Sequence, residues 1–172
     1  MNYQPNIEAV IWFMDNCFKE LKTLIPEFEF VICGANPSKK LLTYQDKFNN
    51  IKVTGKVNSI AKEISKSTLA IAPMISGSGL QNKILEAMSC SIPVLTTTKG
   101  KGDIKAKINK DLLVADTPIE FNKIICKVIS DNAFARRIGL NGRSFVLKNF
   151  NWDNHVDIIE KTINSIKTND SK

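Results

Sequence analysis

Residues 69–98, LAIAPMISGSGLQNKILEAMSCSIPVLTTT, set the fold of the chain. The apolar residues 69–72 predict a buried strand, and residues 74–79 follow it as a loop with two glycines. A helix is expected over residues 80–90 and a second buried strand over residues 92–96. Strand, crossover helix and strand form a right-handed parallel unit, so the stretch predicts an α/β protein with a parallel sheet.

The glycine loop stands directly before the expected helix and has the composition of an anion site. Gly77, Ser78 and Gly79 lead into Leu80, where free backbone N–H groups and the positive end of the helix dipole favour a phosphate. Lys83, one turn further on, would add positive charge. The alternative is that the two glycines make only a turn.

Glu86 lies in the apolar run ILEAM, which is typical of a buried helix. A buried carboxylate is costly unless it is paired or hydrogen-bonded. One interpretation is a pair with Lys83, three residues earlier on the same face. The other is that Glu86 accepts hydrogen bonds from the two ribose hydroxyls of a nucleotide, as an acidic residue does in dinucleotide folds.

Helix and strand patterns alternate along the rest of the chain, which predicts a doubly wound, Rossmann-like parallel sheet. Further helices are expected over residues 6–24, 39–48, 57–66, 104–108, 118–130, 132–149 and 152–167. Further strands are expected over residues 28–33, 51–54 and 112–115. This architecture normally opens with a strand, and the sequence reads as if it starts just after the strand that should precede Asn2.

Capping residues and glycines mark the ends of these elements. Thr117 and Glu120 are spaced as a capping box, and Ser38 and Asp131 are expected to cap the helices that follow them. The stretch KGKGD at residues 99–103 predicts a glycine loop.

A second segment follows another strand at the same edge of the sheet. Gly55 ends that strand, and the backbone of Lys56 and Val57 could meet a nucleobase. The alternative is an ordinary turn at the end of the strand.

Composition narrows the class of protein. The chain has 172 residues, enough for one domain, and its net charge of +7 suits anionic ligands. No basic run is interleaved with aromatics, so nucleic-acid binding is not expected. Four unpaired cysteines and a single histidine, His155, indicate reduced thiols in a cytoplasmic protein and predict no metal site. No run of residues is apolar enough to span a membrane.

The central stretch resembles a known signature. PMISGSGLQNKILEAM at residues 73–88, followed by IPV at 92–94, resembles the donor-site motif of the group 1 glycosyltransferases, which are family 4 enzymes of the GT-B fold. The segments FVICGANP at 30–37, VTGKV at 53–57 and NW at 151–152 are similar to other segments of that family. The resemblance implies the C-terminal half of a GT-B fold, with a nucleotide-sugar donor-binding domain over residues 1–167 and a frayed tail over 168–172.

The resemblance also implies roles for individual residues. Glu86 would hold the donor ribose, the Gly79 and Leu80 amides would meet the diphosphate, and residues 55–57 would line the base pocket. The donor would be a substrate, and neither a metal nor another cofactor is expected. The family often has a second glutamate eight residues earlier, where this chain has Ser78, and this departure leaves the sugar open. Pro5 stands near a basic position of the family.

The expected function is therefore transfer of a sugar to a glycan or lipid-linked acceptor, with an N-terminal acceptor domain as the missing partner. No catalytic residue can be named from these residues. Many relatives glycosylate lipid-linked acceptors, so contact with the inner face of a membrane is plausible. The alternatives are a non-catalytic module that binds a nucleotide or a protein, or an epimerase or phosphorylase of the same fold. An exposed strand edge would favour a homodimer or strand exchange.

Overall fold

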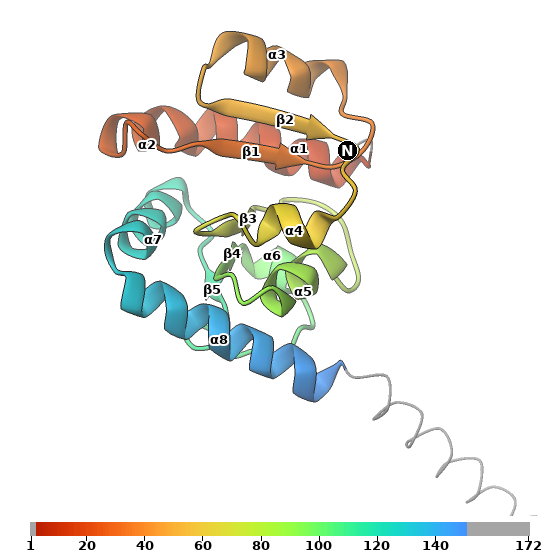
Figure 1. Cartoon of the computed structure of the whole chain (residues 1–172), viewed down its shortest axis with the longest axis vertical. Helices are drawn as coiled ribbons and strands as arrows, with labels where there is room; N and C mark the ends of the chain where they lie inside the picture. The colour runs from red at the N-terminus through yellow and green to blue at the C-terminus, as the bar shows by residue number, and fades with distance from the viewer. Residues whose placement is uncertain (1–2, 151–172) are drawn as a thin grey trace, which may run out of the picture.

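The computed structural model describes residues 3–150, and Figure 1 shows their arrangement. The first described element is one helical stretch, in which α1 (Gln4–Phe13) continues through the π-helical turn η1 (Met14–Phe18) into α2 (Lys19–Leu24). It confirms the helix predicted over residues 6–24, with Pro5 inside its first turn. The helix expected over residues 152–167, with His155, and the tail at 168–172 lie outside the described residues.

Five short strands pair in parallel, but they form two sheets instead of one hydrogen-bonded ladder. The first sheet has the order β1-β2, and the second has the order β3-β4-β5. The strands are β1 (Phe30–Cys33), β2 (Ile51–Gly55), β3 (Ala70–Ala72), β4 (Val94–Thr96) and β5 (Leu113–Val114). The parallel pairing and the α/β class confirm the sequence prediction.

Helices connect the strands and cover both sheets. Each strand from β1 to β4 is followed by a helix before the next strand, as parallel pairing requires. Figure 1 shows α4 bringing the chain back between β2 and β3, so that β3 starts on the far side of β1 from β2. The helices are α3 (Lys39–Lys47), α4 (Ile60–Ile64), α5 (Asn82–Ser89), α6 (Thr98–Lys101), α7 (Pro118–Ser130) and α8 (Asn132–Asn149).

The segment after β4 differs from the prediction. The expected glycine loop at residues 99–103 begins with the helical turn α6, because the Thr97 hydroxyl accepts a hydrogen bond from the Gly100 N–H. The expected helix over residues 104–108 does not form: residues 104–107 have no regular secondary structure, and Ile108 makes an isolated parallel bridge to Leu112. Ile104 and Ala106 are buried while Lys105 and Lys107 are exposed, so the apolar residues follow a period of two, which suits an extended chain.

The predicted caps have mixed outcomes. Thr117 and Glu120 form a complete capping box, and Asp131 accepts a hydrogen bond from the Phe134 N–H. Ser38 stands at the N-cap position of α3 but makes no capping hydrogen bond, and its hydroxyl is buried without a partner. That prediction was wrong, since no first-turn amide of α3 donates a hydrogen bond to the Ser38 hydroxyl.

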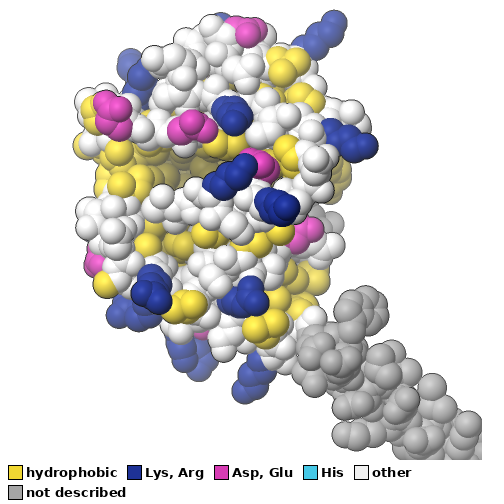
Figure 2. Space-filling model, in the orientation of Figure 1, with side chains coloured by type: hydrophobic (Ala, Val, Ile, Leu, Met, Phe, Trp, Pro, Cys, Tyr) yellow, Lys and Arg dark blue, Asp and Glu magenta, His cyan; other side chains and the backbone are white. Residues whose placement is uncertain are grey.

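Two hydrophobic clusters support the two sheets. One joins α1, η1 and α7 to β1 and β4, and its fully buried members include Phe13, Phe18 and Phe121. The other lies around α5 and includes Met74, Ile84 and Met88. Between the sheets, Figure 2 shows a groove floored with hydrophobic side chains.

Candidate functional site

The glycine loop between β3 and α5 forms one wall of the candidate site. Gly77 and Gly79 have φ angles of 94° and 75°, a left-handed conformation in which other residues are strained. A Cβ added at Gly77 would lie 3.4 Å from the Pro5 Cβ, so the loop packs closely on the start of α1. Ser78, Gly79 and Leu80 are exposed, as contact with a ligand requires.

Gln81 organises this loop, and the sequence reasoning missed it. Its side chain is buried at 8% exposure, and its Nε2 donates to the carbonyls of Ser78 and Gly79 at 3.4 and 3.3 Å. Its Oε1 accepts from the Lys83 Nζ at 2.7 Å. The signal that could have found it is a polar residue at the N-cap position between the glycine loop and an apolar helix, where a side chain can bond local backbone.

Lys83 points toward Gln81 and Met74 instead of forming an ion pair. Its Nζ lies 3.7 Å from the Met74 Sδ, and no ion pair within 4.0 Å joins it to Glu86, although the structure describes both residues. Burial lowers the pKa of Lys83, and the nearby Glu86 charge opposes that shift. The interpretation of a Lys83–Glu86 ion pair was therefore wrong, because Gln81 holds the ammonium group.

Glu86 is exposed, which corrects the expectation of a buried carboxylate. The α5 helix buries Ile84, Ala87 and Met88, and Glu86 lies at its edge with Lys83, where both line the groove between the sheets. Its carboxylate is therefore accessible to ligand hydroxyls without the cost of burial. The one-turn spacing of Lys83 and Glu86 does bring a cation and an anion to the same wall.

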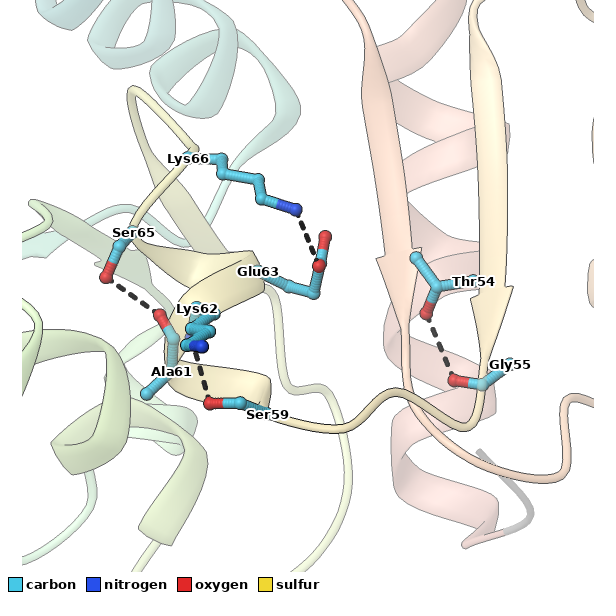
Figure 3. Close-up of polar contacts among 8 residues, drawn as sticks. All are labelled: Thr54, Gly55, Ser59, Ala61, Lys62, Glu63, Ser65 and Lys66. Atoms are coloured by element: carbon cyan, nitrogen blue, oxygen red, sulfur yellow. Dashed lines mark hydrogen bonds and ion pairs between the residues drawn. The ribbon is translucent and has the colours of Figure 1, made fainter.

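The second predicted segment lies on the other side of the groove. Gly55 is opposite Cys33 in the β1–β2 register and has a φ of 65°. The Thr54 hydroxyl donates to the Gly55 carbonyl at 3.1 Å, as Figure 3 shows. Lys56 is exposed and Val57 is half-buried. The structure thus places residues 55–57 beside the carboxyl end of β1, while residues 77–86 follow β3, and it does not bring the two segments into one wall.

A contact that sequence reasoning missed links α1 to the glycine loop. The Ser76 hydroxyl donates to the Glu8 carboxylate, which also accepts from Gln4 at 3.0 Å. These two hydrogen bonds hold the pKa of Glu8 below its ordinary value of 4.5. Because Ser76 and Glu8 are 68 positions apart, nothing in the local pattern points to their pairing.

The described residues hold no group of three or more His, Cys, Asp or Glu side chains placed to bind a metal ion. None of the helices between residues 3 and 150 is long and apolar enough to cross a membrane. The four cysteines are free thiols, and burial raises the pKa of Cys17 to about 12.

The candidate site consists of backbone amides, one lysine and one carboxylate, and it lies at the carboxyl ends of parallel strands. This arrangement suits a phosphorylated ligand with hydroxyl groups.

Two solved structures share this fold. The C-terminal domain of the group 1 glycosyl transferase LpcC from Francisella tularensis matches with a TM-score of 0.69 and 13% identity, over 84% of this chain and 80% of that chain. HepE from Anabaena, in complex with UDP-glucose, matches with a TM-score of 0.71 and 16% identity, over 95% of this chain and 45% of that chain. They confirm the predicted Rossmann-like half of a GT-B fold.

A curated relative and a family model agree with these structures. The uncharacterized glycosyltransferase MJ1069 of Methanocaldococcus jannaschii is 29% identical over 124 residues, 67% of this chain and 32% of that protein. The chain thus spans about a third of the length of this relative. The model of the family described as "Glycosyl transferases group 1" matches residues 1–131. The chain belongs to the group 1 glycosyltransferases.

Proposed function

We propose that this chain is the donor-binding part of a glycosyltransferase that transfers a sugar from a nucleotide-sugar to a glycan or lipid-linked acceptor. Family membership favours a transferase over an epimerase, and HepE, a protein of the same fold, binds UDP-glucose. The acceptor would be held by a further domain, and the reaction would take place in the cytoplasm or at the inner face of a membrane. Synthesis of a polysaccharide or glycoconjugate is the expected setting.

The observation that carries this proposal is the loop at the start of α5. Gly79 and Leu80 are exposed there. Gln81 donates a hydrogen bond to the Gly79 carbonyl, and the Lys83 ammonium group donates one to Gln81. Amides and a cation placed in advance stabilise the negative charge that grows on a leaving diphosphate when the bond to the sugar breaks. A phosphate near such a helix end gains about 0.3–1 kcal/mol per unit charge from the dipole, and more when it is partly buried.

Glu86 has the complementary role. Its exposed carboxylate lies about one turn after Lys83 on α5, so a nucleotide with its diphosphate at the loop would direct its ribose toward it. A carboxylate accepts hydrogen bonds from both ribose hydroxyls. The Gly55, Lys56 and Val57 backbone, across the groove, is the proposed contact for the base. Ser78 stands where many relatives have a second acid, so it would meet the transferred sugar.

The test is isothermal titration of the chain with UDP-, GDP- and ADP-sugars, in buffer with and without EDTA. We expect one of the three nucleotides to bind with or without EDTA. Glu86→Gln should weaken that binding roughly 10- to 150-fold, since a hydrogen bond to a charged group contributes about 1.5–3 kcal/mol. Asp46→Asn, which removes an exposed charge from α3, is the matched control and should bind as the parent does.

Two results would contradict the assignment. One is the absence of binding by every donor. The other is equal binding by the parent chain and by Glu86→Gln. That result would be compatible with the fold but would exclude Glu86 from the site.

A further inference from the structure

The outward face of α8 carries both basic and apolar side chains. Arg136, Arg137 and Arg143 are exposed, and so are Leu140 and Leu147, at 50% and 58%. Helical spacing places the two leucines on one line along the helix, with Arg136 and Arg143 on one side of that line and Arg137 on the other. Figure 2 shows basic and hydrophobic side chains next to one another along the lower part of the molecule, where α8 runs.

The inner face of α8 holds the helix in this orientation. Its buried residues include Gly139 and Gly142. A Cβ added at Gly142 would lie 2.8 Å from the Asp111 carbonyl oxygen, and one added at Gly139 would overlap the Ser91 carbonyl. Backbone this close leaves no room for α8 to rotate about its axis, because a packed interior does not deform freely. The two leucines of the outward face therefore remain in contact with water.

A basic loop, residues 107–110, adjoins α8. The Asn141 side chain of α8 donates from its Nδ2 to the Lys110 carbonyl at 3.1 Å, which fixes the loop against the helix. The loop exposes Lys107 and Lys110 and, between them, Ile108 at 49%. It thus repeats the combination of cations and an aliphatic side chain that the outward face of α8 presents. The three arginines of α8 and the two lysines of the loop are called the basic patch below.

Acidic side chains do not neutralise the basic patch in the described part of the chain. Neither α8 nor the loop contains aspartate or glutamate. Asp111, directly after the loop, is only 8% exposed and accepts a hydrogen bond from the Lys107 N–H at 2.8 Å. Asp131, directly before α8, caps the helix through the Phe134 N–H. Within residues 3–150, no ion pair joins an arginine of α8 to a carboxylate.

Two of the arginines contact neutral groups. The Arg143 guanidinium donates to the Ser89 carbonyl at the end of α5, and the Arg137 guanidinium lies 5.5 Å from the centre of the Phe134 ring. Neither contact removes the charge, and a long basic side chain can pack its stem on the protein while its charged end faces outward. The positive charge of the basic patch is therefore available to an anionic partner.

We propose that the outward face of α8 and the loop at residues 107–110 bind the surface of an anionic lipid bilayer. A cluster of about four to eight basic residues is typical of such a surface. The cations contact lipid phosphates, while Leu140, Leu147 and Ile108 enter the boundary between headgroups and acyl chains. A nucleic acid would also attract the cations, but it would leave these three aliphatic side chains in water, so the geometry favours a bilayer. The inference rests on the membrane setting of the proposed function and names the surface that holds the chain there.

The probe is sucrose-loaded vesicles of phosphatidylcholine, alone or mixed about three to one with phosphatidylglycerol, sedimented with the 172-residue chain in about 0.1 M salt. We expect binding to the anionic vesicles, little binding to the neutral ones, and release from the anionic vesicles at high salt. None of these measurements includes a nucleotide-sugar. Vesicle binding can therefore fail while donor binding holds, and the reverse.

The charge variant is Arg136→Gln with Arg137→Gln. Its matched control, Lys39→Gln with Lys40→Gln, removes the same charge from α3, which Figure 1 shows at the opposite end of the molecule from α8. Each basic residue near an anionic surface contributes about fivefold to binding, so the α8 variant should bind the anionic vesicles roughly 25-fold more weakly. The α3 variant should bind as the parent does, because salt screens charges beyond about 10 Å.

The apolar variant is Leu140→Gln with Leu147→Gln, which keeps every charge of the basic patch. It should weaken binding to the anionic vesicles roughly tenfold or more, because the exposed part of each leucine is no longer transferred out of water. Leu42→Gln, at an exposed leucine of α3, is the matched control and should bind as the parent does. All substituted positions are exposed, so urea unfolding should show stability close to that of the parent chain.

Several results would overturn the proposal. They are no sedimentation with anionic vesicles, equal binding to neutral vesicles, and parent-like binding by either α8 variant. A fourth is displacement of the chain from the vesicles by a single-stranded DNA oligonucleotide at equal phosphate concentration, with the leucine variant binding that DNA as the parent does. That last result would identify the basic patch as a nucleic-acid surface.

Discussion

The β3-β4-β5 sheet has a fully buried central strand, which the β1-β2 sheet lacks. In the β3-β4-β5 sheet, every residue of β4 is buried, with Val94 at 1% and Leu95 and Thr96 at 0% exposure. The hydroxyls of Thr96 and Thr97 also bond the backbone of the β3 side, at 2.7 Å to Ala72 and 2.6 Å to Met74. In the β1-β2 sheet, each strand has a single buried residue, Ile32 in β1 and Ile51 in β2.

This difference separates the roles of the two sides of the candidate site. The glycine loop and α5, which we assign to the diphosphate and ribose, rest on the better packed sheet. Of the residues assigned to the base, Gly55 ends a strand of the sparsely buried sheet, and residues 56–57 follow it. Under the proposed function, the diphosphate contacts would lie on the side with the fully buried strand, and stabilisation of transition-state charge requires such fixed dipoles.

Core truncation should give the largest effect in testing this comparison. Leu95→Ala removes a fully buried side chain of β4 and should lower the free energy of unfolding by about 2–5 kcal/mol. Val31→Ala, in the exposed edge strand β1, should cost less than about 1 kcal/mol, because the Val31 side chain is already 36% exposed. Urea unfolding followed by circular dichroism measures both. Equal losses would show that the two sheets are equally well packed.

The main helices and strands of the fold could be predicted from the sequence. The ends of α7 and α8 matched the prediction, since Thr117, Glu120 and Asp131 are local signals that act on the residues beside them. The five parallel strands also follow from apolar runs bounded by turn residues. The glycine loop was placed correctly because positive φ angles and a following helix constrain one another.

What failed depends on contacts that no local pattern encodes. The apolar run around Glu86 predicted burial on all sides, yet the helix has one exposed edge because the cleft leaves that edge uncovered. The partner of Lys83 is Gln81 instead of Glu86, which is a matter of side-chain direction. The contact between Ser76 and Glu8 joins distant parts of the chain.

Removing helix caps is a second test of this comparison, and the expected loss of stability is intermediate in size. Thr117→Ala should cost about 1 kcal/mol, because it removes the capping hydrogen bond to the Glu120 N–H in α7, which packs on α8. Ser38→Ala, at the start of α3 over the β1-β2 sheet, is the matched control. Its hydroxyl is buried without a partner, so the change should be neutral or slightly stabilising. A loss at Ser38 as large as that at Thr117 would mean that its hydroxyl does cap the helix in solution.

Lowering the pH should give the smallest change in the free energy of unfolding, through the Glu8 carboxylate that joins the two halves. Glu8 lies on α1, which packs on the β1-β2 side, and accepts from Ser76 in the loop that follows β3. Its pKa is lowered in the folded chain, so this contact contributes stability above the ordinary pKa of 4.5, and the contribution is lost as pH falls through the lowered value. Glu8→Gln should therefore reduce the loss of stability between neutral pH and about pH 3, measured by urea unfolding.

Hydrogen exchange distinguishes the joining role of Glu8 from acid sensitivity in general. Glu120 is the control, because the Asp116 N–H and Thr117 lower its pKa within one capping box. Glu120→Gln should also reduce the acid dependence, but only Glu8→Gln should speed amide exchange at Gly77 and Gly79 at neutral pH. If amide exchange in the glycine loop does not change in Glu8→Gln, the loop is held by Gln81 and the β3-β4-β5 sheet alone. The two halves would then be joined through their shared hydrophobic cluster and not through this carboxylate.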